Sequence, residues 1–483
     1  MLDQAEYKRR TVASTTDRKK KSALGQFMTP STVARFMAGL FDIRVGEPVH
    51  LLDAGAGLGA LTGAFLERLT GSRCVRADLF EIDPEISVHL GEVLSTYAQN
   101  GVEISIRNED YIEVGTNMAV GYKQPYTHAI LNPPYKKIAT NSWHRRELRR
   151  AGLETVNLYS GFVGLAIEAL APGGQMVVII PRSFANGPYY MPFRKLLLDR
   201  CSIRRMHLFD ARDKAFKDDA VLQETIIIHL ERDATQGEVQ VSRSTDDSFN
   251  DIEIFTLPFA EIVRPGDKER FIHVPSDGQR SALEQSLAHP SSLTELGLKV
   301  STGPVVDFRM RKYLHASPGE GRIPLLYPTH FRETRLEWPI EGKKPNAITL
   351  DEDTAKWMYP NGWYAVCRRF TAKEERRRVV AGVIDPQALG NIPSIGIENH
   401  INVYHAGKRG TSEVLAKGLA TYLNTTVVDD HVRRFNGHTQ INAGDLKSLP
   451  YPNLAILEEL GRWAIQTNDY SQEAIDNAFR KIA

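Results

Sequence analysis

The sequence is short of cysteine and of net charge. Its 483 residues include three cysteines, Cys74, Cys201 and Cys367, which lie far apart and form no CxxC pair. This spacing argues against a disulfide framework, a zinc site or a redox pair, and it suits a reducing, cytoplasmic compartment. The formal net charge is only +1. Any surface that binds a polyanion must therefore be local rather than global.

Long apolar segments are also missing. No apolar run approaches the roughly 18 residues that a membrane-spanning helix requires. The N-terminus is polar and lacks the apolar core of a secretory signal. We therefore expect no association with a membrane. A basic cluster at Arg18–Lys21 could contact phosphates, although such runs are more often simply solvated.

The length of the chain allows two or three domains. Polar residues dominate between Asp233 and Asn250 and suggest a boundary. We predict a basic N-terminal arm over residues 1–21, an α/β domain over 22–240, and a mixed α+β domain over 241–483. Helical patterns near the C-terminal end cover 412–424, 426–434, 454–466 and 471–482.

Structure is expected to begin near Ser22. The stretch Gly25–Ser31 leads into residues 33–41, whose apolar side chains recur at helical spacing. Thr29 or Ser31 could cap that helix, with a proline near its first turn. Taken alone, this stretch is simply the start of a helix.

A glycine-rich turn follows the first strand pattern. The apolar run Val49–Leu52 leads into Asp53-Ala54-Gly55-Ala56-Gly57-Leu58-Gly59 and then into a helix. Strand, glycine-rich turn and helix is the arrangement by which an α/β fold brings backbone close to a ligand. The glycines read GxGxG after an acid, whereas a dinucleotide fingerprint reads GxGxxG. An acid at the strand end can meet an amino group, so we interpret the turn as a pocket for S-adenosylmethionine rather than NAD.

Polar side chains end four strand patterns in succession. They are Asp53, Glu81, Asp110 and Asn132, and the strands that they follow cover 49–52, 76–80, 102–106 and 128–131. In an open parallel sheet these ends form the ligand-binding edge. Glu81 is placed to accept from ribose hydroxyls, while Asp110 could accept from an adenine amine and Tyr111 could pack on its ring. The regularity favours a binding site over chance.

The fourth strand end carries an unusual tetrad, Asn132-Pro133-Pro134-Tyr135. The residue before a proline is pushed towards extended geometry, and prolines lack N–H groups. Asn132 and the carbonyl of Pro133 can together accept two hydrogen bonds from one amino group, and Tyr135 offers a flat face for stacking. The tetrad is therefore a plausible socket for a planar amine. The alternative is a strand followed by a proline turn.

Two phenylalanines are candidates for the same site. Phe162 lies on an apolar helix and would approach the cofactor if that helix packs on the sheet; it could equally be a core residue. Phe216 lies in a polar loop between two hairpin-like strands, 205–210 and 224–230. It could form the second face of a stacking sandwich with Tyr135, although a loop phenylalanine more often anchors packing.

Basic and aromatic residues alternate in the second half, as in Arg309–Tyr313 and Arg368–Phe370. Such patches suit phosphate anchoring combined with contacts to base edges. The bland alternative is a solvated surface over an ordinary aromatic core. Two loops, Asn399–Asn402 and His438–Asn442, combine His, Asn and Gln without acidic partners. They resemble hydrogen-bonding loops rather than metal sites, so no metal is expected.

With these motifs in order, the first half resembles the γ class of adenine-N6 DNA methyltransferases of restriction–modification systems. The stretches that carry the likeness are GQFMTP, DAGAG, FEID, NEDY, NPPY and the PGG turn. The resemblance implies a class I methyltransferase fold with a Rossmann-like, mixed sheet, and S-adenosylmethionine as cofactor. It implies cofactor-binding roles for Thr29, Asp53, Ala54, Gly55, Gly57, Glu81, Ile82, Asp110, Tyr111 and Phe162. It implies catalytic roles for Asn132, Pro133, Pro134, Tyr135 and Phe216.

The second half resembles the recognition region of type II enzymes similar to the PstI and BsuBI methylases. The stretches VVDFR, PLLYP, KKPNAI, RRFTAKEERRR and FNGHTQINAGDL carry this likeness. It implies that residues 22–240 form the catalytic domain and that residues 241–483 recognise a site in double-stranded DNA, with CTGCAG as the first candidate. The sequence contains no convincing nuclease constellation, so we expect any cleavage to belong to a cognate restriction endonuclease on a separate chain. The oligomeric state stays open.

Three other readings remain open at this point. A protein glutamine-N5 methyltransferase could use the same NPPY socket, because an amide nitrogen also fits it, but it needs neither a long C-terminal half nor the GQFMTP stretch. An RNA methyltransferase is the second. A DNA-binding module with a vestigial pocket is the third, and the intact Asp53, Asp110 and NPPY tetrad argue against it.

Overall fold

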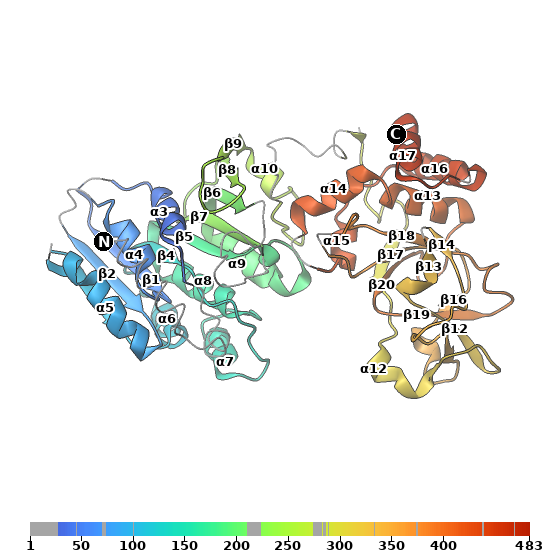
Figure 1. Cartoon of the computed structure of the whole chain (residues 1–483), viewed down its shortest axis with the longest axis horizontal. Coiled ribbons are helices and arrows are strands. Elements are labelled where there is room, and N and C mark those ends of the chain that lie inside the picture. Colours follow the sequence, from blue (N-terminus) through green and yellow to red (C-terminus); the bar gives the residue numbers. More distant parts are fainter. Residues whose placement is uncertain are drawn as a thin grey trace. The chain divides into compact units, whose positions relative to one another are not determined.

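The computed structural model divides the chain into two compact units, Met1–Gly278 and Gln279–Ala483. Figure 1 shows them in colours from blue to yellow-green and from yellow to red. The structure describes residues 28–44, 46–69, 74–99, 101–209, 224–273, 283, 286–287, 289–332, 334–372, 375–436, 439–467 and 469–483. The Arg18–Lys21 cluster and Phe216 lie outside the described residues.

The first unit is built on one mixed sheet. Its strands are β1 (Val49–Ala54), β2 (Val75–Phe80), β3 (Glu103–Arg107), β4 (Tyr126–Leu131), β5 (Leu170–Pro181), β6 (Cys201–Phe209), β7 (Thr225–Arg232), β8 (Val239–Ser244) and β9 (Glu253–Leu257). Their order across the sheet is β3-β2-β1-β4-β5-β7-β6-β8-β9. The first five in this order run parallel, and β7 pairs antiparallel with both β5 and β6. The predicted hairpin-like pair thus corresponds to β6 and β7.

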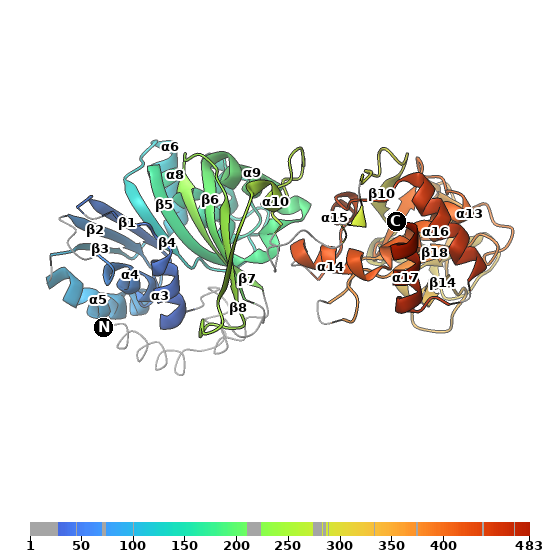
Figure 2. The ribbon, with the colours of Figure 1, turned by 90° about the horizontal axis from the view of Figure 1, so that it is seen from above.

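Helices cover both faces of this sheet (Figure 2). One face carries α3 (Ser31–Gly39), α4 (Ala60–Leu66) and α5 (Pro84–Gln99), and the other carries α6 (Tyr111–Val120), α7 (Trp143–Arg150), α8 (Leu158–Ala169) and α9 (Met191–Arg200). Short helices complete the unit: η1 (Arg182–Ala185), η2 (Pro188–Tyr190) and α10 (Phe259–Ile262). Successive strand residues alternate between the two cores, because side chains along a strand point to opposite faces. Leu51 belongs to the core under α3–α5, and Leu52 belongs to the other.

The strand order reverses between β1 and β4. From β1 the chain builds outwards through β2 and β3, and it then returns to add β4 on the other side of β1. In open α/β sheets ligands bind at such a reversal, beyond the carboxyl ends of the strands. The polar residues that end β1 to β4 therefore share one edge. The predicted fold class, a class I methyltransferase fold with a mixed sheet, is confirmed.

The sheet extends past the predicted boundary at residue 240. Strand β8 pairs parallel with β6, and β9 pairs antiparallel with β8, so both belong to the first unit. The units divide between Gly278 and Gln279 instead. Strand β9 is an exposed edge strand, and its Glu253 forms an ion pair with Arg243 of β8 at 2.7 Å. The polar segment contains β8, where two buried side chains are the serines Ser242 and Ser244, and both are hydrogen-bonded to the ring of His207. A strand with buried serines lacks a continuous apolar pattern, so it resembles a linker in sequence.

The second unit combines small sheets with a helical layer. Its sheets are ordered β10-β20-β17-β18, β11-β15-β12-β19-β16 and β13-β14. The strands of the first are β10 (Lys299–Thr302), β17 (Tyr364–Arg368), β18 (Ala381–Ile384) and β20 (Ile401–His405). Those of the others are β11 (Leu314–His315), β12 (Arg322–Leu326), β13 (Phe331–Arg332), β14 (Arg335–Leu336), β15 (Ala347–Thr349), β16 (Tyr359–Pro360) and β19 (Ser394–Ile397).

Helices near the C-terminus pack together in this unit (Figure 1). They are α13 (Glu413–Leu423), α14 (Thr426–Phe435), α15 (Ala443–Lys447), α16 (Leu454–Gln466) and α17 (Gln472–Ile482). Four short helices come earlier in the chain: α12 (Asp307–Met310), η4 (Arg311–Tyr313), η5 (Pro328–His330) and η6 (Ala355–Trp357). Glycines let α13 and α16 approach closely: a Cβ at Gly418 would lie 1.8 Å from the Leu457 carbonyl oxygen, and one at Gly461 would lie 1.9 Å from that of Val414. Among the described residues, no helix is long and apolar enough to cross a membrane.

Candidate active site

The tetrad lies at the end of β4 and forms a chain of hydrogen bonds. Asn132 donates from Nδ2 to the hydroxyl of Thr29 at 3.0 Å, and its Oδ1 lies 3.0 Å from the Tyr135 hydroxyl as acceptor. That hydroxyl is also 3.1 Å from the carbonyl oxygen of Ile179 in β5. Hydroxyl partners at both ends of the amide hold the Asn132 side chain in one position. The tetrad is therefore a rigid acceptor group rather than a flexible turn.

Thr29 reaches the tetrad because it does not cap α3. The helix begins at Ser31 behind Pro30, and no side chain caps its first turn. The expectation that Thr29 or Ser31 caps this helix is therefore wrong. Pro30 itself occupies the N-cap position, and its side chain has no oxygen that could accept from the N–H groups of the first turn. Thr29 is buried, and its hydroxyl is left to bond Asn132 across 103 positions of sequence.

Gly55 joins the glycine-rich turn to the tetrad. Its φ is +82°, in the region that favours glycine. A Cβ placed there would lie 3.9 Å from the backbone oxygen of Asn132, from Pro134 and from the ring of Phe162. The turn after β1, the tetrad after β4 and the aromatic ring on α8 thus meet at one point. This is the juxtaposition that the sequence predicts for a site at the sheet edge.

Asp53 ends β1 as a fully buried carboxyl group. Its Oδ2 accepts a hydrogen bond from the Thr62 hydroxyl at 2.6 Å, while Oδ1 has no partner among the described residues. Burial raises the pKa of Asp53 to about 7, helped by the nearby charge of Glu81 and opposed by the Thr62 hydrogen bond. An unpartnered oxygen at a buried strand end is a site for a ligand's donor, since buried polar atoms are rarely left unpaired.

Glu81 ties the glycine-rich turn to the end of β2. Its Oε2 accepts the backbone N–H of Gly57 at 3.0 Å, and its Oε1 accepts that of Asp83 at 2.9 Å. Glu81 is buried, and burial raises its pKa. The neighbouring Ile82 is 49 % exposed. An apolar side chain exposed beside a buried acid suits a ligand that carries a flat ring next to hydroxyl groups.

Asp110 follows β3 and caps α6. Its Oδ1 accepts the backbone N–H of Ile112 at 2.9 Å, and its Oδ2 lies 2.8 Å from Nε2 of His144 on α7. The next residue, Tyr111, is buried with a hydroxyl that finds no partner in the described part of the chain. Its ring centroid lies 5.3 Å from that of Phe162. The third and fourth crossovers therefore share an aromatic contact beneath the site.

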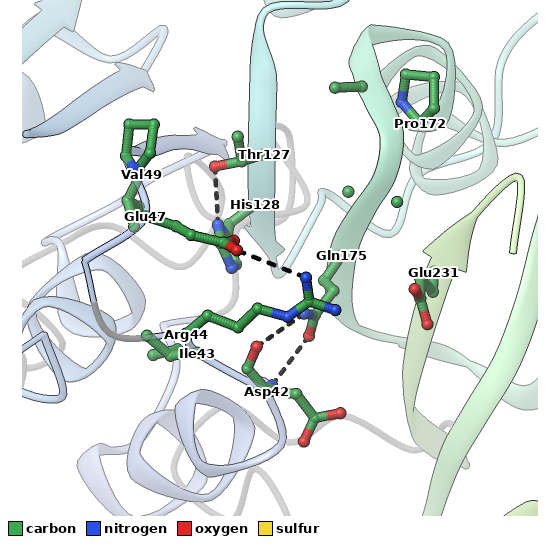
Figure 3. Close-up of a pocket in the computed structure, with 14 residues that line it drawn as sticks. Asp42, Ile43, Arg44, Glu47, Val49, Thr127, His128, Pro172, Gln175 and Glu231 are labelled. Carbon is green, nitrogen blue, oxygen red and sulfur yellow. Dashed lines mark hydrogen bonds and ion pairs between the residues drawn. The ribbon is translucent and has the colours of Figure 1, made fainter. Parts of the chain in front are cut away.

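A separate cavity of about 240 Å³ opens at the opposite edge of the sheet, where β1 and β4 begin (Figure 3). Gln175 crosses it: its Oε1 accepts from the backbone N–H of Asp42 at 3.0 Å, and its Nε2 donates to the Asp42 carbonyl oxygen at 3.0 Å. Arg44 pairs with Glu47 at 3.5 Å, and burial lowers the pKa of His128 to about 4. These groups satisfy one another, so the cavity is a seam between the 42–48 segment and the sheet.

Most of the predicted site residues lie at the one edge. The predicted residues that the structure places there are Thr29, Asp53, Ala54, Gly55, Gly57, Glu81, Ile82, Asp110, Tyr111, Asn132, Pro133, Pro134, Tyr135 and Phe162. Phe216 lies outside the described residues. The sequence analysis did not predict two polar partners of the site: Thr62, which is hydrogen-bonded to Asp53, and His144, which is hydrogen-bonded to Asp110. Thr62 lies in the first turn of the helix after the glycine-rich turn, so its closeness to Asp53 could be predicted from the sequence. No neighbouring sequence pattern indicates that His144 contacts Asp110.

Basic side chains lie over aromatic rings at several places in the second unit. The cation–ring pairs are Arg309–Phe308, Lys312–Tyr313, Arg335–Tyr470, Lys344–Tyr327, Lys356–Trp357, Arg369–Phe370, Lys408–Tyr359 and Lys417–Trp363. The described residues contain no group of three or more His, Cys, Asp and Glu side chains that could hold a metal ion. The basic and aromatic residues that alternate in the sequence thus also lie next to one another in the structure. The second unit offers positive charge beside flat apolar rings.

Comparison with known proteins identifies relatives over nearly the whole chain. The type II methyltransferase M.BsuBI of Bacillus subtilis is 49 % identical over 96 % of this chain and 95 % of its own. The type II methyltransferase M.PstI of Providencia stuartii is 42 % identical over 97 % of this chain and 94 % of its own. Residues 84–216 match the family model of the Eco57I restriction-modification methylase.

Solved structures agree with the fold. The DrdV–DNA complex aligns with 96 % of this chain and 59 % of its own at a TM-score of 0.56 and 12 % identity. The type IIL restriction-modification enzyme MmeI, in complex with DNA, aligns with 100 % of this chain and 73 % of its own at a TM-score of 0.52 and 10 % identity. At these identities the likeness concerns the fold alone. The two relatives similar over nearly their full length confirm the resemblance found in sequence, and the chain belongs to the type II methyltransferases of restriction–modification systems, in the family of M.BsuBI and M.PstI.

Proposed function

We propose that the chain is a site-specific DNA methyltransferase that transfers a methyl group from S-adenosylmethionine to N6 of an adenine in duplex DNA. The observation that carries the proposal is the meeting of the NPPY tetrad with the glycine turn and the Phe162 ring at Gly55. An acceptor socket for an amine and a cofactor turn then share one crevice. The methylated site would be protected from a cognate restriction endonuclease on another chain.

The cofactor pocket is supported by the chemistry of the groups that line it. The unpartnered Oδ1 of Asp53 suits the amino group of the methionine moiety, because it is buried and needs a donor. Glu81 would accept from the ribose hydroxyls, with Ile82 against the adenine ring. The backbone at Gly57, with φ of +52° and open space where a side chain would be, leaves room for close approach. The residues fit S-adenosylmethionine, which when bound supplies an electrophilic methyl group.

The tetrad would prepare the substrate nitrogen. The lone pair of the adenine amine is conjugated into the ring, so the nitrogen is a weak nucleophile. Oδ1 of Asn132 and the carbonyl of Pro133, which accepts no hydrogen bond from the described part of the chain, would hold the two N6 hydrogens. Holding them draws the nitrogen towards tetrahedral geometry and frees its lone pair. Catalysis then consists of positioning and electrostatics rather than a covalent intermediate on the protein.

The target base has to leave the duplex. Enzymes that modify a base inside a helix extrude it, at a cost of a few kcal/mol, and stack it in a pocket. Tyr135 is partly exposed beside Asn132 and offers the flat face of its ring for stacking on the base. Phe216 stays a predicted second face. The second unit would select the site and position the DNA, through positive charge and flat side chains that suit phosphate and base contacts.

A labelling experiment separates this proposal from its alternatives. The purified chain would be incubated with S-adenosylmethionine carrying a labelled methyl group and with duplex DNA, RNA or protein. Label in DNA, recovered as N6-methyladenine after digestion, supports the proposal, and sequencing of the modified DNA then supplies the target. Label on a protein glutamine or in RNA, with none in DNA, would replace it with one of the other two activities.

A further inference from the structure

Glu398 is a carboxylate buried entirely in the second unit, and one residue occupies both of its oxygens. It follows β19 and shows no exposed surface. Its Oε2 accepts the backbone N–H of His400 at 2.9 Å, and its Oε1 is hydrogen-bonded to the ring Nδ1 of the same histidine. Removing a carboxylate from water is costly unless its partners are good. The carboxylate therefore holds His400 by both backbone and ring.

The ring that Glu398 holds faces solvent. The His400 side chain is 41 % exposed. Its Nδ1 is engaged, so Nε2 is the remaining polar atom, and it has no partner in the described part of the chain. The ring centroid of Phe370 lies 4.7 Å away, and Phe370 is 38 % exposed although it is large and apolar. Two rings from different segments thus stand together at the surface, one of them with its outer nitrogen available.

Three loops far apart in sequence lock this pair in place. We call residues 368–371, 398–402 and 439–442 the three-loop cluster. The backbone N–H of Arg369 donates to the carbonyl oxygen of His400 at 2.8 Å, and that of Ile441 donates to the carbonyl oxygen of Arg369 at 2.7 Å. Phe370 and Gln440 form an isolated β-bridge. The positions of His400 and Phe370 are therefore set by backbone pairing and not by the side chains alone.

Arg369 adds positive charge behind the two rings. Its guanidinium donates to the carbonyl oxygen of Asn399 at 3.2 Å and to Oε1 of Gln440 at 3.1 Å, with Oδ1 of Asn442 at 3.4 Å. All three acceptors are neutral, and no carboxylate pairs with this arginine within the described ranges. Arg369 is therefore not neutralised by a direct ion pair. An arginine without an ion-pair partner, an exposed ring nitrogen and an exposed flat ring together match the chemistry of a nucleic-acid contact.

A purely structural role explains less. The backbone bonds and Arg369 already tie the loops together, and neither needs an exposed imidazole held by a buried acid. Fixing a surface ring removes the conformational freedom that binding would otherwise have to remove, which is how preorganised contacts gain affinity. The cluster contains the Asn399–Asn402 loop and part of the second loop rich in His, Asn and Gln. In the structure these two sequence motifs are therefore hydrogen-bonding loops that lie together.

We propose that His400, oriented by Glu398 and flanked by Phe370, is a DNA-contacting residue that hydrogen-bonds the duplex through Nε2. The proposal rests on the proposed function, because it assumes a DNA substrate. Glu398 acts as a positioning residue. The acceptor or donor on the DNA is a base edge or a phosphate, and these differ in their measurable consequences. A base contact governs preference for one sequence, whereas a phosphate contact weakens all sequences alike and lowers the salt dependence of binding.

The test is duplex binding by the full chain at several salt concentrations, with a duplex that carries the modified sequence and an unrelated duplex of equal length. His400→Ala is expected to lower affinity for the target duplex roughly tenfold or more. Phe370→Ala and Glu398→Gln are expected to lower it less. A loss confined to the target duplex identifies a base contact, and an equal loss on both with a shallower salt slope identifies a phosphate contact. Either result supports the proposal.

His89→Ala is the matched control. His89 lies on α5 of the first unit, is 45 % exposed, and pairs with Glu92 at 3.4 Å, but that glutamate is itself 55 % exposed. Its replacement should leave DNA affinity unchanged. Cofactor affinity and Tm should stay near wild type in every variant. Wild-type affinity in His400→Ala overturns the proposal, as does a DNA loss that appears only together with lost cofactor binding. If the wild type itself methylates no DNA, the proposed function fails first.

Discussion

The two units bury a carboxylate beside a strand end in opposite ways. Asp53 in the first unit leaves Oδ1 unpartnered, and burial raises its pKa to about 7. Glu398 in the second unit is equally buried, but both of its oxygens are engaged by His400. A buried oxygen without a partner can bind a ligand directly. A carboxylate whose oxygens are both engaged acts through the residue that it holds.

The difference follows from how each unit arranges its backbone. In the first unit four neighbouring parallel strands end at the same edge, so single residues such as Asp53 and Asn132 lie side by side at the ends of adjacent strands. The second unit has several small sheets, and its exposed groups come from loops that need a partner to hold them. We therefore expect single substitutions to separate cofactor binding, chemistry and DNA binding from one another.

The largest effect is expected at the chemical step. Asn132→Ala removes one of the two acceptors for the substrate amine and also the partner of Thr29. Loss of one preorganised polar group in a transition state lowers kcat by roughly 10³-fold. Single-turnover methyl transfer to duplex DNA measures the loss in rate, and isothermal titration measures the affinity for the cofactor. Cofactor affinity should largely survive, because Asp53 and Glu81 are untouched. Turnover near the wild-type value would remove the tetrad from the mechanism.

The next effect is on cofactor binding. Asp53→Asn keeps the size of the side chain and its acceptor for Thr62, but it removes the charge that would meet the cofactor's amino group. A hydrogen bond to a charged group contributes about 1.5–3 kcal/mol, so affinity should fall about 10- to 100-fold. Calorimetric titration of the cofactor measures it. Glu398→Gln is the matched control from the other unit, and it should leave cofactor affinity unchanged. Equal losses in both variants would erase the contrast between the two carboxylates.

The raised pKa of Asp53 predicts how cofactor binding depends on pH. Below about pH 7 the carboxyl group is protonated and cannot pair with an ammonium group, so affinity should fall roughly five- to tenfold from pH 7 to pH 6. Asp53→Asn should abolish this pH dependence of cofactor affinity.

The raised pKa of Asp53 also makes the stability of the fold depend on pH. Because folding raises this pKa from 3.8, the folded state favours the protonated form, and stability is lost as pH rises through about 7. Melting temperatures of wild type and Asp53→Asn between pH 5 and pH 8 should diverge accordingly, and parallel curves would contradict the prediction.

Sequence predicts the edge of the first sheet because its signals are local. An apolar strand, a polar residue and a turn follow one another within ten residues at Asp53 and Glu81, and parallel pairing then brings the strand ends together. The contacts between segments are not local. Thr29 meets Asn132 over 103 positions, and Arg369 meets Gln440 over 71. Such pairs depend on packing, which a single sequence does not encode in any short pattern.

The second unit was harder for the same reason. The sequence pattern predicts α13, α14, α16 and α17 close to their observed bounds, because their apolar faces repeat at 3.6 residues over ten or more positions. It does not predict α15, which has only five residues. The strands of this unit are two to five residues long, too short for alternation to be recognised. The role of Glu398 was invisible, since its residue type in sequence says nothing about burial. The hydrogen-bonding loops were recognised by composition, but their convergence was not.

The smallest expected effect tests what Thr29 does. Resemblance assigns it to the cofactor, whereas its hydroxyl accepts from Nδ2 of Asn132. If it orients the amide, Thr29→Val should lower kcat roughly threefold, the worth of one neutral hydrogen bond, and leave cofactor affinity unchanged. Thr29→Ser keeps the hydroxyl and should restore the rate. Weaker cofactor binding with an unchanged kcat would return Thr29 to the cofactor pocket, because a positioning residue acts on the step that its partner performs.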